Sequence, residues 1–186
     1  MDNRLKITPA FARLHAHICG DGYSYVVKYK RSEKELLDHP RKNIIKVHYA
    51  VRYVNKNEFL VKQFIDDVNF VFKRKVVVLL KKWEYEVSAK WIYDIFIGYG
   101  ALKSLNWFIP DSIINSNKIV RREWLKAFFD DEGHVSRSAI YLKIVNERGI
   151  LQIKRLLLDF GINSRLYGPY IPKNPNHSMC FRIGIL

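Results

Sequence analysis

The chain has 186 residues, of which 32 are Lys or Arg and 18 are Asp or Glu, so its formal net charge is +14. A hydrophobic content of 48% is enough to bury a core in one domain or two small ones, which excludes a disordered basic tail. Two cysteines without a Cys-x-x-Cys pair exclude a disulfide framework and a zinc ribbon, while the charge favours a polyanionic partner such as nucleic acid.

The first half of the chain predicts a helix and two strands, followed by a second helix and two further strands. Thr8 is a typical N-cap and Pro9 suits the first helical position, so a helix should begin here and run to about Cys19. Apolar and polar residues alternate over 24–30 and 46–53, the pattern of half-buried strands that can pair antiparallel across a long connection. The remaining expected elements are a helix at about 57–70, strands near 75–80 and 83–88, and a helix capped by Ser88 that runs through Tyr99.

The second half repeats this order in a shorter form. A helix that begins near Lys118 precedes a strand at about 138–145, a helix at about 147–159 and a final hairpin from 165–167 and 181–183. Val54-Asn55 matches Val145-Asn146 at an offset of 91, which indicates a degenerate tandem duplication. We expect an N-terminal half at 1–102, a linker at 103–117 and a C-terminal half at 118–186.

Two of the predicted helices end in an acid followed by glycine. LHAHICGDG at 14–22 and LKAFFDDEG at 125–133 share Leu, Ala and Gly in register, and Asp21 matches Glu132. A carboxylate at the electronegative end of a helix costs roughly 0.3–1 kcal/mol, so its repetition indicates a cation between the two ends. Oxygen ligands without a nearby Cys or His pair select Mg²⁺. A basic protein with Mg²⁺ between two carboxylates points to phosphodiester hydrolysis.

With these two motifs, the chain resembles the single-chain LAGLIDADG homing endonucleases over nearly its whole length. Ala16 and Ala127 stand where the family often has glycine, and alanine is small enough for two helices to pack closely. The resemblance implies an α+β fold with two pseudo-symmetric αββαββ halves, whose antiparallel sheets form a DNA-binding saddle around central motif helices. It also implies a monomer that cuts double-stranded DNA at a long, low-symmetry site and leaves short 3′ overhangs.

The resemblance also implies a metal site built on the two motif acids. The implied ligands are the carboxylates of Asp21 and Glu132, helped by backbone carbonyls near Gly20 and Asp131. Two or more Mg²⁺ ions are expected, with Mn²⁺ as a substitute and Ca²⁺ supporting binding without cleavage.

The family further places a basic residue and an amide near the scissile phosphates. Asn55 and Lys56 hold these places in the first half, where Lys56 can polarise solvent or stabilise a charged transition state. Asn146 is retained in the second half, but Glu147 stands where a lysine would be repeated. A second catalytic lysine is therefore in doubt, and unequal cleavage of the two strands is expected. The residues that could substitute for it are Lys143 and Arg148.

The outward faces of the predicted strands are the expected DNA-reading surface, because a two-stranded ribbon fits the major groove. In the first half these residues are Ser24, Val26, Lys28 and Lys30 with Lys46, His48, Ala50 and Arg52. In the second half they are Tyr141, Lys143, Arg165, Tyr167, Ser178 and Arg182. The long first-half connection adds the expected phosphate contacts Arg31, Lys34, Arg41 and Lys42. Any one of these charges can equally be an ordinary solvated side chain.

Two other functions remain open at this stage. The same fold serves RNA maturases that assist intron splicing, with intron RNA as the partner, and non-catalytic DNA-binding regulators. Both motif acids are intact, which favours the nuclease, and a free-standing chain of this size favours an intron as its coding context. No apolar run approaches the roughly 18 residues of a membrane span, and no signal-type stretch is present. We expect no membrane partner and an intracellular location, cytoplasmic in a prokaryote and organellar or nuclear otherwise.

Overall fold

A computed structural model of the chain describes residues 5–38, 43–79, 83–174 and 176–185. The first half contains α1 (Pro9–Cys19), β1 (Gly22–Lys30), α2 (Glu33–Asp38), β2 (Ile45–Val54), α3 (Glu58–Phe72), β3 (Val77–Leu79), β4 (Glu84–Ser88) and α4 (Lys90–Gly98). After α5 (Asp111–Ile114), the second half contains α6 (Lys118–Glu132), β5 (Gly133–Val135), β6 (Ile140–Ile144), α7 (Glu147–Asp159), β7 (Arg165–Tyr170) and β8 (Cys180–Ile185). The αββαββ order of both halves agrees with the prediction, whereas α2, α5 and the short β5 were not predicted.

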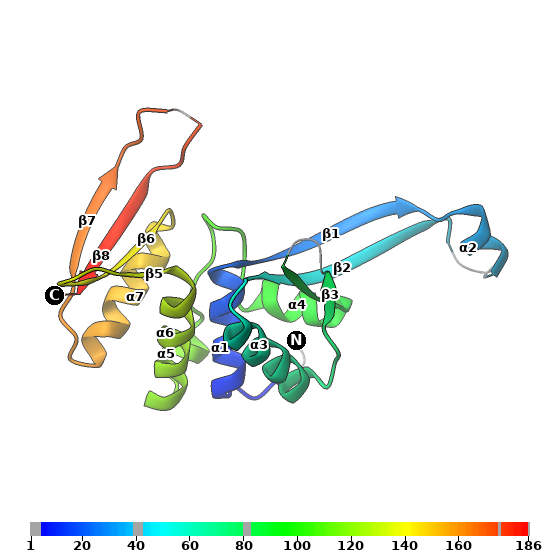
Figure 1. The fold of residues 1–186 in the computed structure, drawn as a ribbon. Coiled ribbons are helices and arrows are strands. Elements are labelled where there is room, and N and C mark those ends of the chain that lie inside the picture. Colours follow the sequence, from blue (N-terminus) through cyan, green and yellow to red (C-terminus); the bar gives the residue numbers. More distant parts are fainter. Residues whose placement is uncertain (1–4, 39–42, 80–82, 175, 186) are drawn as a thin grey trace.

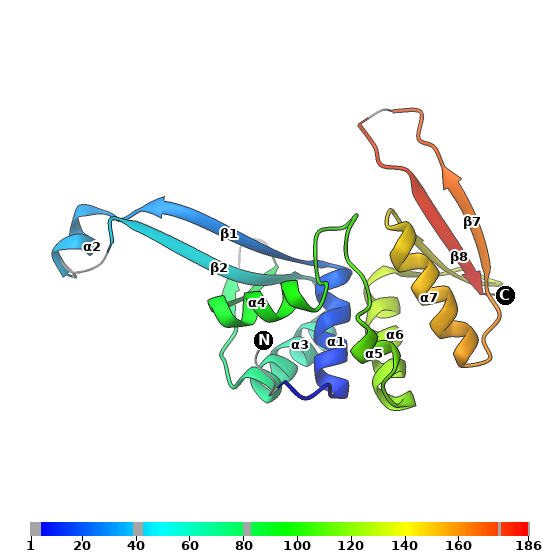
Figure 2. The same cartoon turned by 180° about the vertical axis from the view of Figure 1, so that it is seen from behind.

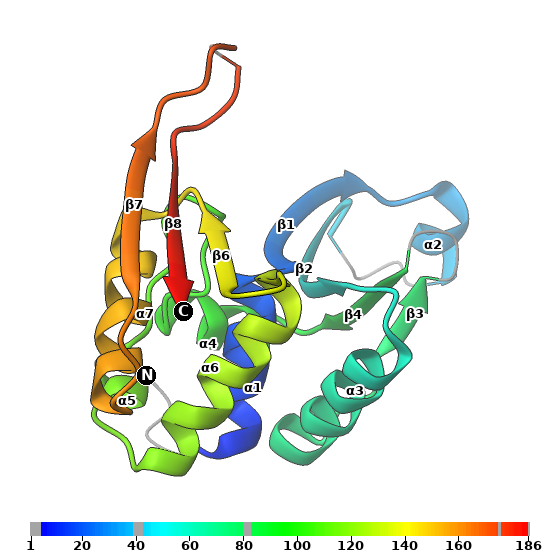
Figure 3. The ribbon, with the colours of Figure 1, turned by 60° about the vertical axis from the view of Figure 1, so that its left-hand side comes forward.

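Each half is built on a four-stranded antiparallel sheet. The strand orders are β1-β2-β4-β3 and β5-β6-β8-β7. The motif helices α1 and α6 lie side by side at the centre of the molecule, with one sheet on either side (Figures 1 and 2). The β1–β2 and β7–β8 hairpins extend beyond the helices as two arms (Figures 1 and 3). The predicted two-half α+β fold with central motif helices is confirmed. Among the described residues, no helix is both long and apolar enough to cross a membrane.

The start of α1 and its junction with β1 follow from local sequence. The Thr8 side chain accepts a hydrogen bond from the backbone N–H of Phe11 (3.2 Å), and Pro9 occupies the first helical turn. At the other end, a Cβ atom added to Gly22 would lie 2.6 Å from the Cα of Ile18. Glycine is therefore required where the chain turns sharply from α1 into the sheet. This turn places Asp21, the residue before Gly22, next to the end of α1.

The contact between α1 and α6 combines small residues with buried polar bonds. Ala16 and Ala127 are almost fully buried, which allows the close helix packing that was predicted. Beside them, His15 accepts a hydrogen bond from the indole N–H of Trp124 (2.9 Å) and donates one to the carbonyl of Tyr99 (2.9 Å). Burial lowers the pKa of His15 to about 4, so the imidazole is neutral and serves to join the two halves.

The two halves correspond at an offset of 89 residues after the motif helices. Gly22 pairs with Tyr53 and Gly133 pairs with Leu142, and 142 minus 53 is 89. The side-chain caps of α3 and α7 are Asn57 and Asn146, which again differ by 89.

The predicted match between Asn55 and Asn146 is therefore wrong. Asn146 caps α7 by accepting from the backbone N–H of Gly149 (2.9 Å), and its amide donates to the buried carbonyl of Trp107 (2.6 Å). By the offset of 89, the residue equivalent to Asn55 is the apolar Ile144. The two Val-Asn pairs look equivalent in the sequence because both asparagines lie near the beginning of a helix.

The register of β1 against β2 corrects the predicted outward face of the first sheet. Val51 and Tyr53 are fully buried under the helices, and the cross-strand partner of Val51 is Ser24. Because directly opposite residues lie on the same face, the open face carries Lys46, His48, Ala50 and Arg52 with their partners Tyr29, Val27, Tyr25 and Tyr23. The prediction that Ser24, Val26, Lys28 and Lys30 share this face is wrong. Alternation within each strand does not reveal how two strands are phased, and tyrosine has both an apolar ring and a polar hydroxyl, so it suits either face.

Candidate active site

The two motif acids meet where α1 and α6 end. Asp21 follows Gly20, the C-cap of α1, whereas Glu132 is the last residue of α6, and both side chains are half-buried. A Cβ atom added to Gly20 would lie 3.2 Å from the Cβ of Asp131 and 3.4 Å from the Cγ of Glu132. The four residues assigned to the metal site from sequence therefore come together in one small region.

The electrostatics of this region favour a bound cation. Burial and, to a smaller extent, the charge of Asp131 raise the pKa of Asp21 to about 6, although a hydrogen bond from Asn55 opposes the rise. Burial, followed by the charges of Asp21 and Asp131, raises the pKa of Glu132 to about 7. In the part of the chain that the structure describes, no Lys or Arg side chain forms an ion pair with either acid. A divalent cation would relieve this repulsion.

The side chain of Asp131 forms a buried polar cluster that sequence reasoning missed. The Asp131 side chain is fully buried, and its Oδ1 accepts hydrogen bonds from the Tyr53 hydroxyl (2.6 Å) and the Asn55 amide (3.4 Å). Its Oδ2 lies 2.8 Å from Nδ1 of His17. The Asn55 amide also donates to Oδ2 of Asp21 (3.0 Å), so a chain of hydrogen bonds connects the cluster to the first motif acid.

The residues present fit a magnesium ion held jointly with substrate. Within the described ranges, no three His, Cys, Asp or Glu side chains are grouped so that they alone could hold a metal. Mg²⁺ does not need such a cage, because it keeps several waters and typically takes one or two carboxylates together with substrate phosphates. The carboxylates of Asp21 and Glu132 provide that partial set, and His17 lies with Asp131 instead.

The candidate basic residues differ between the two halves. Lys56 is exposed next to Asn55, and its Nζ lies 6.0 Å from the centre of the Trp83 ring. Its equivalent at the offset of 89 is Val145, so Glu147, in the first turn of α7, is not its counterpart. Of the two possible substitutes, Arg148 stacks 4.2 Å from the centre of the Phe108 ring, whereas Lys143 is exposed on the open face of β6.

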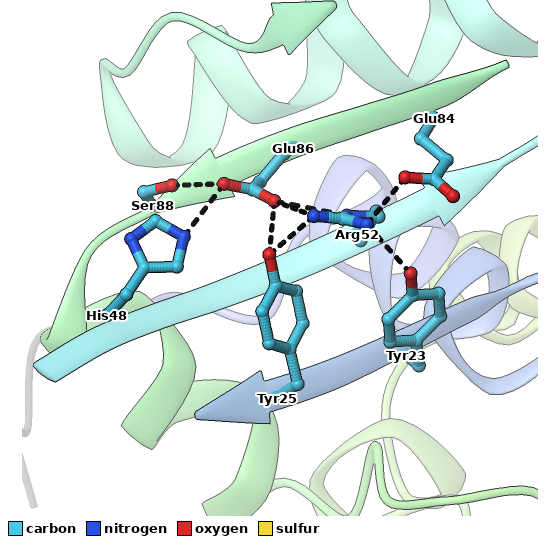
Figure 4. Close-up of polar contacts among 7 residues, drawn as sticks. All are labelled: Tyr23, Tyr25, His48, Arg52, Glu84, Glu86 and Ser88. Atoms are coloured by element: carbon cyan, nitrogen blue, oxygen red, sulfur yellow. Dashed lines mark hydrogen bonds and ion pairs between the residues drawn. The ribbon is translucent and has the colours of Figure 1, made fainter. Parts of the chain in front are cut away.

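A buried carboxylate organises the open face of the first sheet. Glu86 is 7% exposed and accepts hydrogen bonds from Tyr25, His48, Arg52 and Ser88 (Figure 4). Burial alone would raise the pKa of Glu86, but these four bonds outweigh it and lower the pKa to about 2. The prediction that Ser88 caps α4 is wrong. Ser88 ends β4 with its hydroxyl bonded to Glu86, and the N-cap position is Ala89, which has no side-chain bond.

The charge of Arg52 is neutralised within this cluster. Its guanidinium contacts both Glu84 (2.5 Å) and Glu86 (2.5 Å), and it also donates to the Tyr23 hydroxyl (3.0 Å) (Figure 4). A phosphate would have to compete with two carboxylates for this side chain. Around Glu86 the first sheet therefore presents hydroxyl and imidazole groups rather than a free positive charge.

The open face of the second sheet keeps its positive charge. Cross-strand pairing places Tyr141, Lys143, Arg165, Tyr167 and Arg182 on one face, as predicted. The Arg182 guanidinium lies 5.0 Å from the ring centre of Tyr141 and 4.8 Å from that of Tyr167. Across the residues that the structure describes, none of these basic side chains has an acidic partner. Ser178 is exposed in the loop between β7 and β8.

Of the residues expected to contact phosphates in the first half, those that the structure describes lie at the outer end of the β1–β2 hairpin. Arg31 donates to the carbonyl of Asn43 (3.0 Å) and lies 3.7 Å from Glu35, and Lys46 lies 3.5 Å from the same carboxylate. Lys34 is exposed on α2, and Lys28 and Lys30 are exposed on the opposite face of the ribbon from Lys46. The other two predicted contacts, Arg41 and Lys42, lie outside the described residues.

Comparisons with known proteins identify the fold. Residues 120–183 match the LAGLIDADG-like domain family. A structure of mesophilic variants of the homing endonuclease I-DmoI has a TM-score of 0.68 at 20% identity and covers 97% of this chain and 89% of that chain. I-DmoI in complex with DNA and Mn gives 0.68 at 19% identity, with 97% and 91% covered. The I-LtrWI LAGLIDADG homing endonuclease bound to target DNA gives 0.52 at 10% identity, with 97% and 79% covered. No curated protein sequence matches the chain.

Proposed function

We propose that this chain, which has the fold of the LAGLIDADG homing endonucleases, is a site-specific double-strand DNA endonuclease. The observation that carries the proposal is the pair of half-buried carboxylates, Asp21 and Glu132, at the ends of two packed helices. Two open sheet faces lie on either side of this pair, and the protein has a net charge of +14. Proteins of the same fold have been crystallised with DNA and with Mn, Ca or Mg.

Asp21 and Glu132 are the residues that would hold Mg²⁺ in this function, with the carbonyls of Gly20 and Asp131 as helpers. When bound, such an ion polarises a phosphoryl oxygen and lowers the pKa of water. Asn55 donates to Asp21 and fixes its orientation. Lys56 is exposed beside Asn55, where its charge can stabilise the negative charge that develops on a phosphate in the transition state.

The two sheets contribute unequally to DNA binding in this proposal. Lys143, Arg165 and Arg182 supply positive charge from the second sheet for phosphate and guanine contacts. The first sheet offers the Tyr23 hydroxyl and the His48 imidazole, with Arg52 held behind them. Because the two faces differ in charge and chemistry, the target site should have low symmetry. We further propose that the protein acts as a monomer and that an intron encodes it.

The test is cleavage of a duplex in which the two exons flanking the coding intron are joined. The expected result is cutting at one site with Mg²⁺ or Mn²⁺, short 3′ overhangs, and binding without cutting in Ca²⁺. A protein that binds this duplex tightly but never cuts it in Mg²⁺ would be a regulator. If intron RNA also displaced the duplex, the protein would be a maturase, and either result would overturn the proposal.

A further inference from the structure

The buried cluster around Asp131 has no counterpart on the other side of the pseudo-two-fold axis. The two motifs are 111 residues apart, so the residue equivalent to Asp131 is Gly20 and the residue equivalent to His17 is Phe128. At the offset of 89 that holds beyond the helices, Tyr53 corresponds to Leu142 and Asn55 corresponds to Ile144. For each of the four polar members of the cluster, the equivalent position in the opposite half is therefore occupied by glycine or by an apolar residue.

The four polar residues occur together because the buried carboxylate of Asp131 needs the hydrogen bonds of the other three. A carboxylate that is fully buried without hydrogen-bond partners strongly destabilises the folded state. Tyr53, Asn55 and His17 each direct a nitrogen or a hydroxyl at Asp131 and satisfy it. Because a carboxylate can only accept, Nδ1 of His17 carries the proton in this contact. Both oxygens of Asp131 are thus satisfied on one side of the interface, while Nε2 of His17 is buried without a hydrogen-bond partner among the described residues.

The geometry also excludes Asp131 as a direct metal ligand through its side chain. Its Oδ1 is bonded to Tyr53 and Asn55, its Oδ2 is bonded to His17, and the side chain has 0% exposure. Its contact with the active site runs through the Asn55 amide, which donates to both Asp131 and Asp21. Among the described residues, Glu132 receives no comparable side-chain hydrogen bond.

We propose that Asp131 is a positioning residue that holds the Asn55 amide and, through it, fixes Oδ2 of Asp21, so that the two motif acids are not equivalent. The inference rests on the proposed nuclease function and deepens it. Asp21 is oriented before a metal binds, whereas Glu132 is free to adjust. Residues that orient a metal ligand in this way typically contribute 10–100-fold to metal affinity or activity. The orientation should also make the two DNA strands react at different rates.

The test compares Asp131→Asn with Asp130→Asn. An amide has one acceptor oxygen, so Asn at position 131 cannot satisfy donors on both of its sides. Asp130 is exposed on the same helix end, and its carboxylate has no hydrogen bond among the described residues, so its substitution removes the same charge and leaves the cluster intact. Mn²⁺ affinity of the DNA-free protein is measured by electron paramagnetic resonance. Single-turnover rates are then measured for each labelled strand at saturating Mg²⁺.

Asp131→Asn should weaken Mn²⁺ binding by about 10–100-fold and change the ratio of the two strand rates, whereas Asp130→Asn should leave that ratio unchanged. Equal effects of the two variants would overturn the proposal, because charge alone would then explain them. If Asp131→Asn does not fold, as judged by circular dichroism, Tyr53→Phe removes one donor with little change in volume and should change Mn²⁺ affinity in the same direction. A wild-type protein that cuts no DNA would refute the nuclease, while the Mn²⁺ measurement would still test the positioning.

Discussion

Replacing Glu132 by Gln should stabilise the metal-free protein at pH 8. Burial, then the charges of Asp21 and Asp131, raise the pKa of Glu132 from 4.5 to about 7. At about 1.4 kcal/mol per pKa unit this rise corresponds to about 3 kcal/mol. The half-buried carboxyl retains part of its hydration, so we expect a gain of about 1–2 kcal/mol.

The sign of the effect follows from proton linkage. The folded state binds the Glu132 proton more tightly than the unfolded state does, so the free energy of unfolding falls as the pH rises from 4.5 through about 7. Gln binds no proton in either state and removes this loss. The advantage of Glu132→Gln should therefore be largest at pH 8 and should shrink toward pH 5.

Thermal unfolding in EDTA at pH 5 and pH 8 measures this difference. A gain of about 1–2 kcal/mol corresponds to a rise in Tm of about 2–8 °C for a chain of this size. The control Glu147→Gln removes an exposed acid from the first turn of α7 and should instead lower stability by about 0.3–1 kcal/mol. Adding Mg²⁺ should raise the Tm of the wild type more than that of Glu132→Gln. A variant that is destabilised equally at both pH values would refute the reasoning.

Three further substitutions test the packing and the DNA-binding faces. Gly149→Ala should lower the free energy of unfolding by about 1–3 kcal/mol in urea denaturation, because an added Cβ would overlap the buried Trp107 ring. Arg52→Ala should cost about 3–5 kcal/mol by leaving Glu86 buried without its cation, and the double variant with Glu86→Gln should recover part of that loss in the same assay. Lys143→Ala should weaken duplex binding in Ca²⁺ and reduce the slope of log K against log salt by about 1 in fluorescence anisotropy, because Lys143 is exposed on the open face of the second sheet. An unchanged slope would remove Lys143 from the phosphate contacts.

The arrangement of elements was predictable because its signals are local. The N-cap Thr8 with Pro9 marks the beginning of α1, and the alternation of 46–53 marks β2. The two motifs are recognisable because each places an acid at the C-terminal end of a helix, where a negative charge is unfavourable. Their in-register duplication also implied that Asp21 and Glu132 would meet, and the structure brings them together.

The parts that sequence reasoning missed depend on tertiary partners. The register of β1 decides which face carries Tyr25, and no pattern within that strand reports its partner on β2. Ser88 is a good helix cap by residue type, but its hydroxyl donates to the carboxylate of Glu86 on the same face of β4, which is held there by Tyr25, His48 and Arg52 from β1 and β2. For Asp131 a signal did exist. Motif two has Asp where motif one has Gly20, but its donors Tyr53 and His17 come together with it only in the fold.

The measurement that tests the central claim most directly is metal-dependent cleavage of the joined-exon duplex by wild type, Asp21→Asn, Glu132→Gln and Asp130→Asn. Binding of the same duplex is measured in parallel in Ca²⁺. We predict that wild type and Asp130→Asn cut at one site in Mg²⁺, and that either motif-acid substitution abolishes double-strand cleavage while all four proteins still bind. Cleavage that survives in Asp21→Asn or Glu132→Gln would contradict the assignment of the metal site to these two carboxylates.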